Sequence, residues 1–375
     1  MTRRLVLSSD SHVVEPPHLW TERMDPMFGE RIPHMVHEEP FDQFYCDFHP
    51  VGAIGGSSQA GKRFSKPEEV ILAGAFADVP PGGYDPGAHL QDLDIDGVYA
   101  DVLYPSIGLS LFFQPNTQFL RPVFSAYNDW LSHFCSTDPN RLKGIGMIVI
   151  DDDVESGINE LKRCAEIGLC GAMISVSPRQ GETYDQPIYD PFWATAQDLD
   201  IPLSLHVSTN RPGGSRTGVT TNGTDRSNID YWVRMSLGHI IFSGVLDRFP
   251  RLKIVNVEHG LSWIPYYTQR MDDNYTDFHA FTPYRFKGST LPSDFMRTNV
   301  FHSFQDDHLG IILRDYIGVD NILWASDYPH AESTFPKSQE ILDKILEGVP
   351  ENEVSKIVAE NCAKLYGFSI DGLQQ

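Results

Sequence analysis

Short apolar runs alternate with longer stretches of helical pattern from residue 98 onward. Such alternation is typical of βα units, in which a helix returns the chain to the start of the next parallel strand. With one more run near the N-terminus, eight strands are predicted, at 5–9, 98–104, 142–150, 172–176, 203–206, 253–257, 299–303 and 322–325. Helices are predicted at about 116–135, 153–167, 190–200, 230–248, 261–275 and 306–317. Eight units favour a closed barrel over an open sheet.

The predicted fold is therefore α/β, a distorted TIM (β/α)₈ barrel formed by one domain over 1–375. No GxGxxG run opens a helix after the first strand, which argues against a Rossmann fold. Residues 21–97 show no regular pattern beyond a hairpin near 41–56, and so long an insertion is predicted to be a lid. Further loops are expected at 208–228 and 276–296. Loops that follow barrel strands gather at the face where TIM-barrel enzymes carry their active sites.

Composition excludes several classes of protein and partner. Hydrophobic residues are 41% of the chain and charged residues 21%, which excludes a disordered protein. The net charge of -22 opposes association with nucleic acid or an anionic membrane. Five scattered cysteines without a CxxC pair argue against a disulfide framework or a cysteine zinc site. No run is long and apolar enough for a signal peptide or a membrane span, so we expect a cytoplasmic protein with a small-molecule substrate.

Four polar residues lie where predicted strands open to the barrel mouth. Asp10 and His12 are two residues apart, so an extended chain points both to one face. His206 ends the strand at 203–206, and Asp327 follows the last strand. Two imidazoles and two carboxylates suit one divalent ion, Zn²⁺ first, with Mn²⁺ or Fe²⁺ as alternatives. Each residue alone has a structural alternative, such as a helix cap at Asp327, but their joint placement favours a metal site.

Other residues near the same strand ends are candidates for proton transfer or substrate contact. Glu258 and His259 follow the strand at 253–257, and alternation along a strand predicts that one of them faces inward. We assign general acid/base catalysis to His259, because an ordinary imidazole titrates near neutral pH. Glu258 is then a further ligand or a residue that orients one. Glu15 is either a structural residue at a turn or a ligand-orienting residue, and His330 either reaches substrate or lies on the surface.

Several of these residues belong to motifs that resemble the amidohydrolase-related family, which includes aminocarboxymuconate semialdehyde, γ-resorcylate and 5-carboxyvanillate decarboxylases. The motifs are SDSHVVEP at 9–16, the histidine at 206, GVLDRFPRLK at 244–253, EHGLSW at 258–263, SDYPH at 326–330 and NCAKLYG at 361–367. The resemblance implies a distorted TIM barrel, a single divalent metal, commonly zinc or manganese, and a homodimer or homotetramer. By position, it implies the metal ligands Asp10, His12, His206 and Asp327 and the catalytic residue His259, with Asp327 also taking part in catalysis.

The chain also departs from that family's pattern. The decarboxylases usually carry His or Glu where this chain has Asp10, so direct ligation by the shorter Asp10 is the least secure transfer. The strand at 172–176 offers no Lys or Glu to bridge two ions, which predicts a mononuclear site, although Glu258 and His330 could serve a second ion. The arginine that would bind a substrate carboxylate is left open among four candidates, Arg63, Arg211, Arg226 and Arg234.

These observations predict a metal-dependent carboxy-lyase or hydrolase. A non-oxidative decarboxylase of a small aromatic or unsaturated carboxylate is placed first, because the site looks mononuclear and the named family members are decarboxylases. A hydrolase of an ester, amide or lactone is nearly level with it, since a bound metal also activates water. A dinuclear iron enzyme that uses oxygen ranks third. A barrel used only as a binding scaffold ranks last, because its inward polar residues would lack partners.

Overall fold

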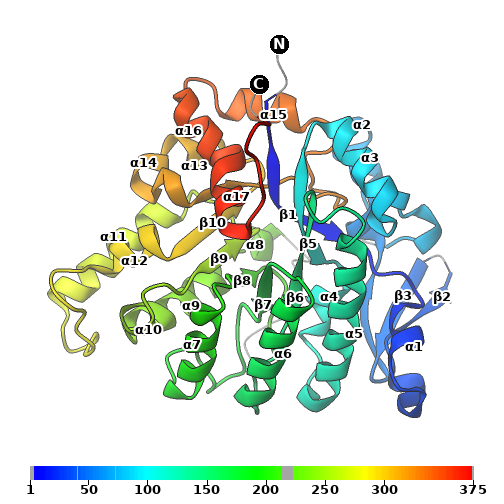
Figure 1. The fold of residues 1–375 in the computed structure, drawn as a ribbon, viewed down its shortest axis with the longest axis horizontal. Helices are drawn as coiled ribbons and strands as arrows, with labels where there is room; N and C mark the ends of the chain where they lie inside the picture. Colours follow the sequence, from blue (N-terminus) through cyan, green and yellow to red (C-terminus); the bar gives the residue numbers. More distant parts are fainter. Residues whose placement is uncertain (1–3, 40, 72, 213–222, 374–375) are drawn as a thin grey trace.

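The computed structural model describes residues 4–39, 41–71, 73–212 and 223–373, and these form a parallel barrel surrounded by helices (Figure 1). The sheet order is β1-β5-β6-β7-β8-β9-β10-β11. The strands are β1 Leu7–Val13, β5 Ala100–Pro105, β6 Leu142–Met147, β7 Gly171–Ile174, β8 Leu203–His206, β9 Ile254–Val257, β10 Val300–Phe304 and β11 Ile322–Trp324. The predicted TIM barrel is confirmed, and every predicted strand overlaps an observed one.

The barrel closes where β1 meets the segment that follows β11. The backbone N–H of Asp327 donates to the carbonyl oxygen of Asp10 at 2.9 Å, and the N–H of His12 donates to the carbonyl oxygen of Tyr328 at 2.6 Å. All seven residues of β1 are buried, as expected for a strand of a parallel barrel that is covered on both faces. The seam therefore brings Asp10 and His12 beside Asp327, which is more than 300 residues away along the chain.

Helices cover the outside of the barrel, but two predicted helices are each interrupted. The helix expected at 230–248 divides at Gly244, whose φ of 75° is left-handed and where a side chain would meet the ring of Tyr284. The helix expected at 306–317 likewise forms two short pieces. The barrel helices are α4 Ile107–Leu111, α5 Thr117–Cys135, α6 Val154–Glu166, α7 Asp190–Asp198, α8 Gly223–Arg226, α9 Tyr231–Phe242, α10 Val245–Arg248, α11 Ile264–Asp277, α12 Pro292–Thr298, α13 His308–Ile312, α14 Arg314–Ile317, α15 Ser338–Ile345, α16 Glu351–Ser355 and α17 Asn361–Tyr366.

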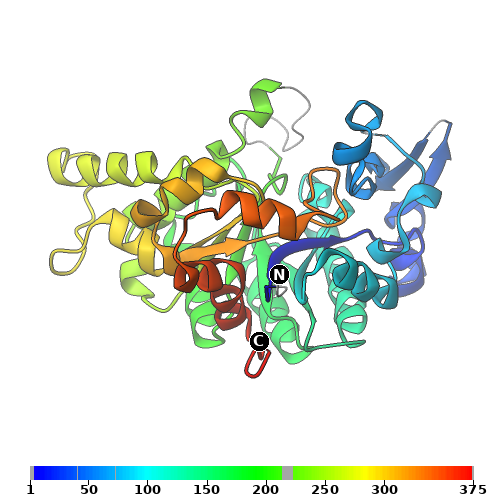
Figure 2. The same cartoon turned by 90° about the horizontal axis from the view of Figure 1, so that it is seen from above.

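The insertion between β1 and β5 stands at one side of the barrel (Figure 2). The expected hairpin is present and gains a third strand, so that β2 His34–Glu38, β3 Phe41–Cys46 and β4 His49–Ala53 form an antiparallel sheet. The insertion also contains α1 Leu19–Arg23, α2 Lys62–Ser65 and α3 Pro86–Asp96. The expectation of no further regular structure was wrong, because α3 carries clear boundary signals, an Asp85 side chain that caps it and Gly97 at its end.

Two expectations concern the parts of the chain outside the barrel wall. Of the loop expected at 208–228, residues 213–222 lie outside the described residues, and α8 forms part of the remainder. The loop expected at 276–296 contains the start of α12. Across the described ranges, no helix combines the length and the apolar character needed to cross a membrane. The five cysteines are free thiols, as expected from their spacing.

Candidate metal centre

Five acidic and imidazole side chains converge at the carboxyl ends of four barrel strands. Asp10 and His12 come from β1, and His206 ends β8. Glu258 directly follows β9, and Asp327 follows β11. Four of these side chains are fully buried, and Glu258 is 14% exposed. We call these five residues the donor cluster.

The donor cluster brings possible ligand atoms together without pairing them. His12 Nε2 lies 3.5 Å from Asp10 Oδ1 and 3.2 Å from Asp327 Oδ1. His206 Nε2 lies 3.5 Å from Asp10 Oδ1 and 3.6 Å from Glu258 Oε2. Among the described residues, both carboxylate oxygens of the two aspartates and both Nε2 atoms lack a hydrogen-bond partner. Ligand atoms that share one ion at about 2.1 Å stand roughly 3–3.5 Å apart, so the spacing fits a bound cation.

The two histidines are oriented by backbone carbonyl groups. His12 Nδ1 lies 2.8 Å from the carbonyl oxygen of Pro105, and His206 Nδ1 lies 2.9 Å from that of Val207. A carbonyl oxygen can only accept, so each Nδ1 carries a hydrogen, and Nε2 is the nitrogen that has a lone pair when the ring is neutral. A lone pair on Nε2 is what a metal requires of an imidazole, and such outer hydrogen bonds fix the ligand's orientation.

The charge in the donor cluster is strongly negative. Burial lowers the pKa of His12, and the neighbouring His330 lowers it further, which favours the neutral imidazole. Burial and the charge of Asp327 raise the pKa of Glu258 well above its usual value. Burial opposes ionisation of Asp327, but His330 and His12 outweigh it and hold the pKa of Asp327 below its usual range. Buried carboxylates of this kind need a cation or a proton, and a divalent ion would offset two of their charges.

The alternation rule that expected only one of Glu258 and His259 to face inward was wrong. Strand β9 ends at Val257, and Glu258 adopts a left-handed backbone conformation with φ 66°. Asp327 shows the same feature with φ 60°. Left-handed residues other than glycine are uncommon and often occur at functional sites. Because the chain turns at Glu258, both it and His259 approach His206.

His259 is a buried imidazole without partners. It is 4% exposed, and neither ring nitrogen makes a hydrogen bond with any residue that the structure describes. Burial and the nearby His206 lower the pKa of His259 to about 3, so the expectation of a pKa near neutrality was wrong. Desolvation disfavours the charged imidazole, and the ring is neutral at pH 7. A neutral imidazole beside the donor cluster can accept a proton.

A family model described as amidohydrolase matches residues 78–368. The chain belongs to the amidohydrolase family. The resemblance drawn from the sequence motifs is therefore confirmed, as is the prediction of an enzyme. A gamma-resorcylate decarboxylase from Rhizobium sp. (strain MTP-10005) is 26% identical over 269 residues, which cover 65% of this chain and 75% of that protein.

Two solved structures share the fold of this amidohydrolase. An amidohydrolase from Mycobacterium avium subsp. paratuberculosis K-10 superimposes with a TM-score of 0.78 at 20% identity, covering 99% of this chain and 100% of that chain. A 5-carboxyvanillate decarboxylase from Novosphingobium aromaticivorans DSM 12444, complexed with manganese and 4-hydroxy-3-methoxy-5-nitrobenzoic acid, gives a TM-score of 0.68 at 18% identity and covers 97% and 96%. At these identities the structures establish a common fold.

Two further candidate residues of the amidohydrolase, His330 and Glu15, differ in whether they contact the donor cluster. The His330 ring stacks on His12 with centroids 3.8 Å apart, so His330 is not a surface residue. Glu15 does not join the cluster, because its carboxylate accepts hydrogen bonds from the backbone N–H groups of Ser106, Ile107 and Gly108 at 3.2, 2.9 and 2.8 Å. Burial outweighs these bonds and raises the pKa of Glu15 to about 7.

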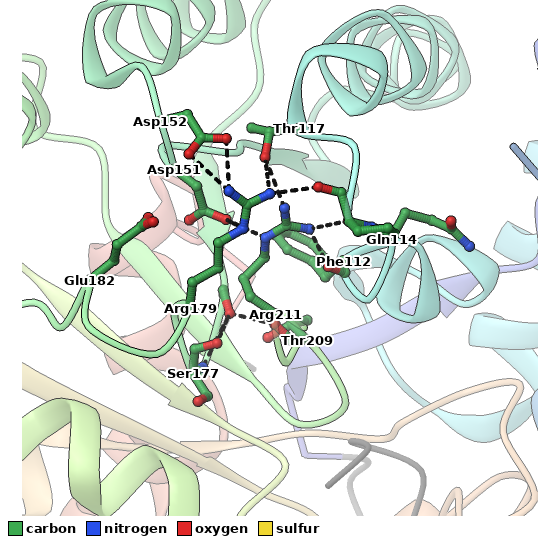
Figure 3. A network of polar contacts seen from close by, with 12 residues as sticks. Phe112, Gln114, Thr117, Asp151, Asp152, Ser177, Arg179, Glu182, Thr209 and Arg211 are labelled. Atoms are coloured by element: carbon green, nitrogen blue, oxygen red, sulfur yellow. Dashed lines mark hydrogen bonds and ion pairs between the residues drawn. The ribbon is translucent and has the colours of Figure 1, made fainter. Parts of the chain in front are cut away.

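Of the four candidate arginines, Arg211 is the most buried and is held by its own protein (Figure 3). Its Nε donates to Asp151, and its Nη1 donates to the carbonyl oxygens of Phe112 and Gln114. Its Nη2 donates to Thr117 Oγ1 at 3.1 Å. Four of the five N–H donors of Arg211 are engaged within the protein, so Arg211 cannot offer a substrate carboxylate two parallel hydrogen bonds.

The other three candidates differ in what they already bind. Arg226 forms an ion pair of 2.6 Å with Glu332, and Arg234 forms one of 2.8 Å with Asp230. Arg63, on α2 of the insertion, has buried Nε and Nη2 atoms with no hydrogen-bond partner in the described part of the chain. Burial lowers the pKa of Arg63, while Asp306 and Asp327 act in the opposite direction, which places Arg63 within electrostatic reach of the donor cluster.

Proposed function

We propose that this amidohydrolase is a metal-dependent, non-oxidative decarboxylase of a small aromatic or unsaturated carboxylate. The observation that carries the proposal is the donor cluster, whose buried oxygens and Nε2 atoms lack partners and lie at the spacing of ligands around one ion. The neutral His259 beside it supplies a group for proton transfer. The 26% identity to a gamma-resorcylate decarboxylase supports decarboxylation over other reactions of the family.

Asp10, His12, His206 and Asp327 would hold one divalent ion. Glu258 lies in reach of the first three, and Asp327 is connected to them through His12, which it shares with His330. When bound, the ion supplies a Lewis acid that polarises an oxygen of the substrate. Zinc remains our first choice for its affinity for imidazole, and the oxygen-rich set also suits Mn²⁺ or Fe²⁺. Manganese in the related carboxyvanillate decarboxylase supports that alternative.

Arg63 is the residue that we assign to the substrate's carboxylate. Its guanidinium stacks on the Phe64 ring at 4.5 Å and keeps two buried nitrogens free. A guanidinium binds a planar carboxylate through two parallel hydrogen bonds. Because Arg63 belongs to the insertion, substrate binding would draw the insertion toward the site. We therefore propose that the insertion acts as a lid and that it forms one domain with the barrel.

Two backbone hydrogen bonds tie the insertion to the segment that carries Asp327. The N–H of Ala60 donates to the carbonyl oxygen of Pro329 at 3.0 Å, and the N–H of Ala331 donates to that of Gly56 at 3.0 Å. These two contacts between the insertion and the loop that follows β11 support the proposed lid. A covered site excludes water, which strengthens electrostatic interactions with the substrate.

For a phenolic carboxylate, the protein's residues act as follows. Neutral His259 accepts the proton of the substrate hydroxyl and gives it to the carbon that carries the carboxylate. The bond from that carbon to the carboxylate then breaks, its electron pair returns to the ring, and CO₂ leaves. The product departs as a phenolate, which takes a proton from solvent. Arg63 holds the carboxylate until the bond breaks.

The proposal is tested with 2,6-dihydroxybenzoate and 5-carboxyvanillate in H₂¹⁸O. We expect one CO₂ for each product molecule and no ¹⁸O in the product, whereas a hydrolase acting on an ester, amide or lactone panel would incorporate one ¹⁸O. Arg63→Met should raise KM about tenfold or more, because it removes both free donors. Arg234→Met, which removes an arginine already paired with Asp230, is the matched control and should leave KM unchanged. Stoichiometric ¹⁸O in the product would replace decarboxylation with hydrolysis.

We further propose that the enzyme works in the cytoplasm as a homodimer or homotetramer. Three large apolar side chains, Leu309, Ile312 and Tyr316, are exposed on α13 and α14 and support an association surface there. Sedimentation of the purified protein at micromolar concentration should give two or four chains per particle. A monomer at that concentration would contradict this part of the proposal.

A further inference from the structure

A line of polar contacts leads from the donor cluster to the residue that follows β5. His330 Nδ1 lies 3.1 Å from Asp327 Oδ1, and His330 Nε2 lies 3.0 Å from Ser106 Oγ. Ser106 is 6% exposed and directly follows Pro105, the last residue of β5. The imidazole of His330 therefore faces Asp327 with one nitrogen and Ser106 with the other.

The chemistry of these groups decides which way the hydrogens point. An ionised carboxylate only accepts, so His330 Nδ1 must carry the hydrogen that faces Asp327. The other nitrogen, Nε2, accepts from the Ser106 hydroxyl when the ring is neutral and donates to Ser106 Oγ when the ring is charged, so the contact exists in both forms. The stacking of His330 on His12, with 20° between the rings, restricts tilting of the imidazole. The Ser106 hydroxyl thus fixes the orientation of the ring whose Nδ1 faces Asp327.

Ser106 is itself held in place by Glu15. The Ser106 N–H donates to Glu15 Oε2, and the next two N–H groups also donate to that carboxylate. The space there is tight, because a side chain on Gly108 would lie 3.0 Å from Glu15 Oε1. Glu15 lies just past the end of β1, three residues after His12. It therefore fixes the position of Ser106 relative to the strand that carries two members of the donor cluster.

We propose that Ser106 and His330 are positioning residues that hold the Asp327 carboxylate in the orientation that metal binding needs. The proposal rests on the proposed function, because it takes Asp327 to be a metal ligand. The Asp327 oxygens accept no hydrogen bond of good geometry, so contacts with the imidazoles of His12 and His330 are what orient the carboxylate. Outer residues that orient a ligand typically change metal affinity by about 10–100-fold when they are removed.

Two substitutions at His330 separate its two contacts. His330→Asn places an amide nitrogen near the position of Nδ1 and keeps a donor toward Asp327. His330→Gln places the amide near the position of Nε2, so that it reaches Ser106 and loses Asp327. We expect the dissociation constant for Zn²⁺ or Mn²⁺, measured on metal-depleted protein against a chelating dye, to rise about tenfold or more in the Gln variant and less than threefold in the Asn variant.

Ser106 is tested in the same titration. Ser106→Ala should weaken metal binding about tenfold, and Ser106→Thr, which keeps the hydroxyl, should restore most of the affinity. Ser110→Ala, on the same helix α4, is the matched control and should bind metal like the wild type. Circular dichroism of the metal-free proteins checks that each variant is folded. If Ser106→Ala is not folded, the test rests on Ser106→Thr and on the two His330 variants.

Wild-type affinity in both Ser106→Ala and His330→Gln would overturn the positioning role while leaving the proposed metal site intact. Wild-type affinity in Asp327→Ala would instead overturn the ligand role of Asp327 on which this inference rests. The two failures are therefore distinguishable in one set of measurements.

Discussion

The donor cluster and the arginine network of Figure 3 both place charged groups at the carboxyl ends of barrel strands or in the loops that follow them, and in the network Asp151 and Arg211 are buried while Asp152 is half exposed. In the arginine network, which we define as Thr117, Asp151, Asp152, Arg179 and Arg211, two guanidinium groups face two carboxylates. Arg179 Nη1 donates to both oxygens of Asp152 at 2.8 and 2.7 Å, and its Nη2 donates to Thr117 Oγ1 at 2.5 Å. Every charge in that network has a partner within the protein.

The donor cluster has three acidic side chains and two imidazoles, and no arginine or lysine is paired with them in the described residues. Burying an unpaired polar group costs about 1–3 kcal/mol. A chain that keeps several such groups together retains them for a ligand or for chemistry. The arginine network is therefore a charged cluster that holds loops together, whereas the donor cluster is suited to binding a ligand, such as a metal ion, from outside the chain.

Removing one member of the donor cluster should have the largest effect. We expect His206→Ala to lose most bound metal and to reduce turnover about 10³-fold or more, because a Lewis acid contributes several kcal/mol to such reactions. Metal content is measured by atomic emission on protein purified without added metal. His239→Ala, at a partly exposed histidine on α9, is the control and should keep metal and activity. One equivalent of tightly bound metal in the His206 variant would remove the donor cluster from its assigned role.

His259 is a further test of the donor cluster. Its ring lacks hydrogen bonds with the described residues, as the cluster's ligand atoms do, but we assign it to proton transfer and not to metal binding. His259→Asn should keep its metal and lose about 10²–10⁴-fold in turnover. Because the pKa of His259 is lowered to about 3, the wild-type ring is neutral throughout pH 5–8, and we expect the same fold loss at each pH. A wild-type limb near pH 6.5 that disappears in the variant would contradict the lowered pKa.

The sequence predicts best where strand ends and spacing decide the geometry. Asp10 and His12 share a face because side chains alternate along a strand, and His206 and Asp327 follow from the position of apolar runs. Glu258 was harder to place, because its left-handed φ overrides alternation and only the structure reveals it. Helix α3 was missed although Asp85 and Gly97 mark its ends, since its apolar residues do not form a regular stripe.

Contacts between distant residues could not be predicted from local pattern. Ser106 and His330 are 224 residues apart, and nothing around Ser106 distinguishes it from other serines. Arg211 was one of four candidate substrate-binding arginines, and its capture by Asp151, 60 residues away, depends on how two loops pack. Sequence patterns therefore predict the candidate ligands, but they do not predict the distant residues that orient or support those ligands.

Breaking the arginine network should affect stability rather than metal. Arg211→Met leaves the buried Asp151 only the longer contact with Arg179 Nε at 3.6 Å, and removing one member of a buried pair typically costs about 3–5 kcal/mol. We expect that decrease in the free energy of unfolding in urea, while the folded variant still binds one equivalent of metal. Arg251→Met breaks an exposed pair with Asp198 and should cost less than about 1 kcal/mol. Loss of metal in folded Arg211→Met would show that the two clusters are not independent.

Glu15 offers the finest test, because it is a buried carboxylate held only by backbone N–H groups and by no cation. Its pKa is raised from 4.5 to about 7, so the folded protein binds a proton that the unfolded chain releases between these values. The stability that depends on Glu15 is then fully present below pH 4.5 and declines by about 1.4 kcal/mol per pH unit as the pH rises toward 7. Glu15→Gln cannot ionise, so the wild-type free energy of unfolding minus that of the variant should fall by this amount between pH 5 and 6 in urea titrations. A difference that stays constant across this range would mean that the three N–H groups compensate the Glu15 charge in full, as the arginine network does for Asp151.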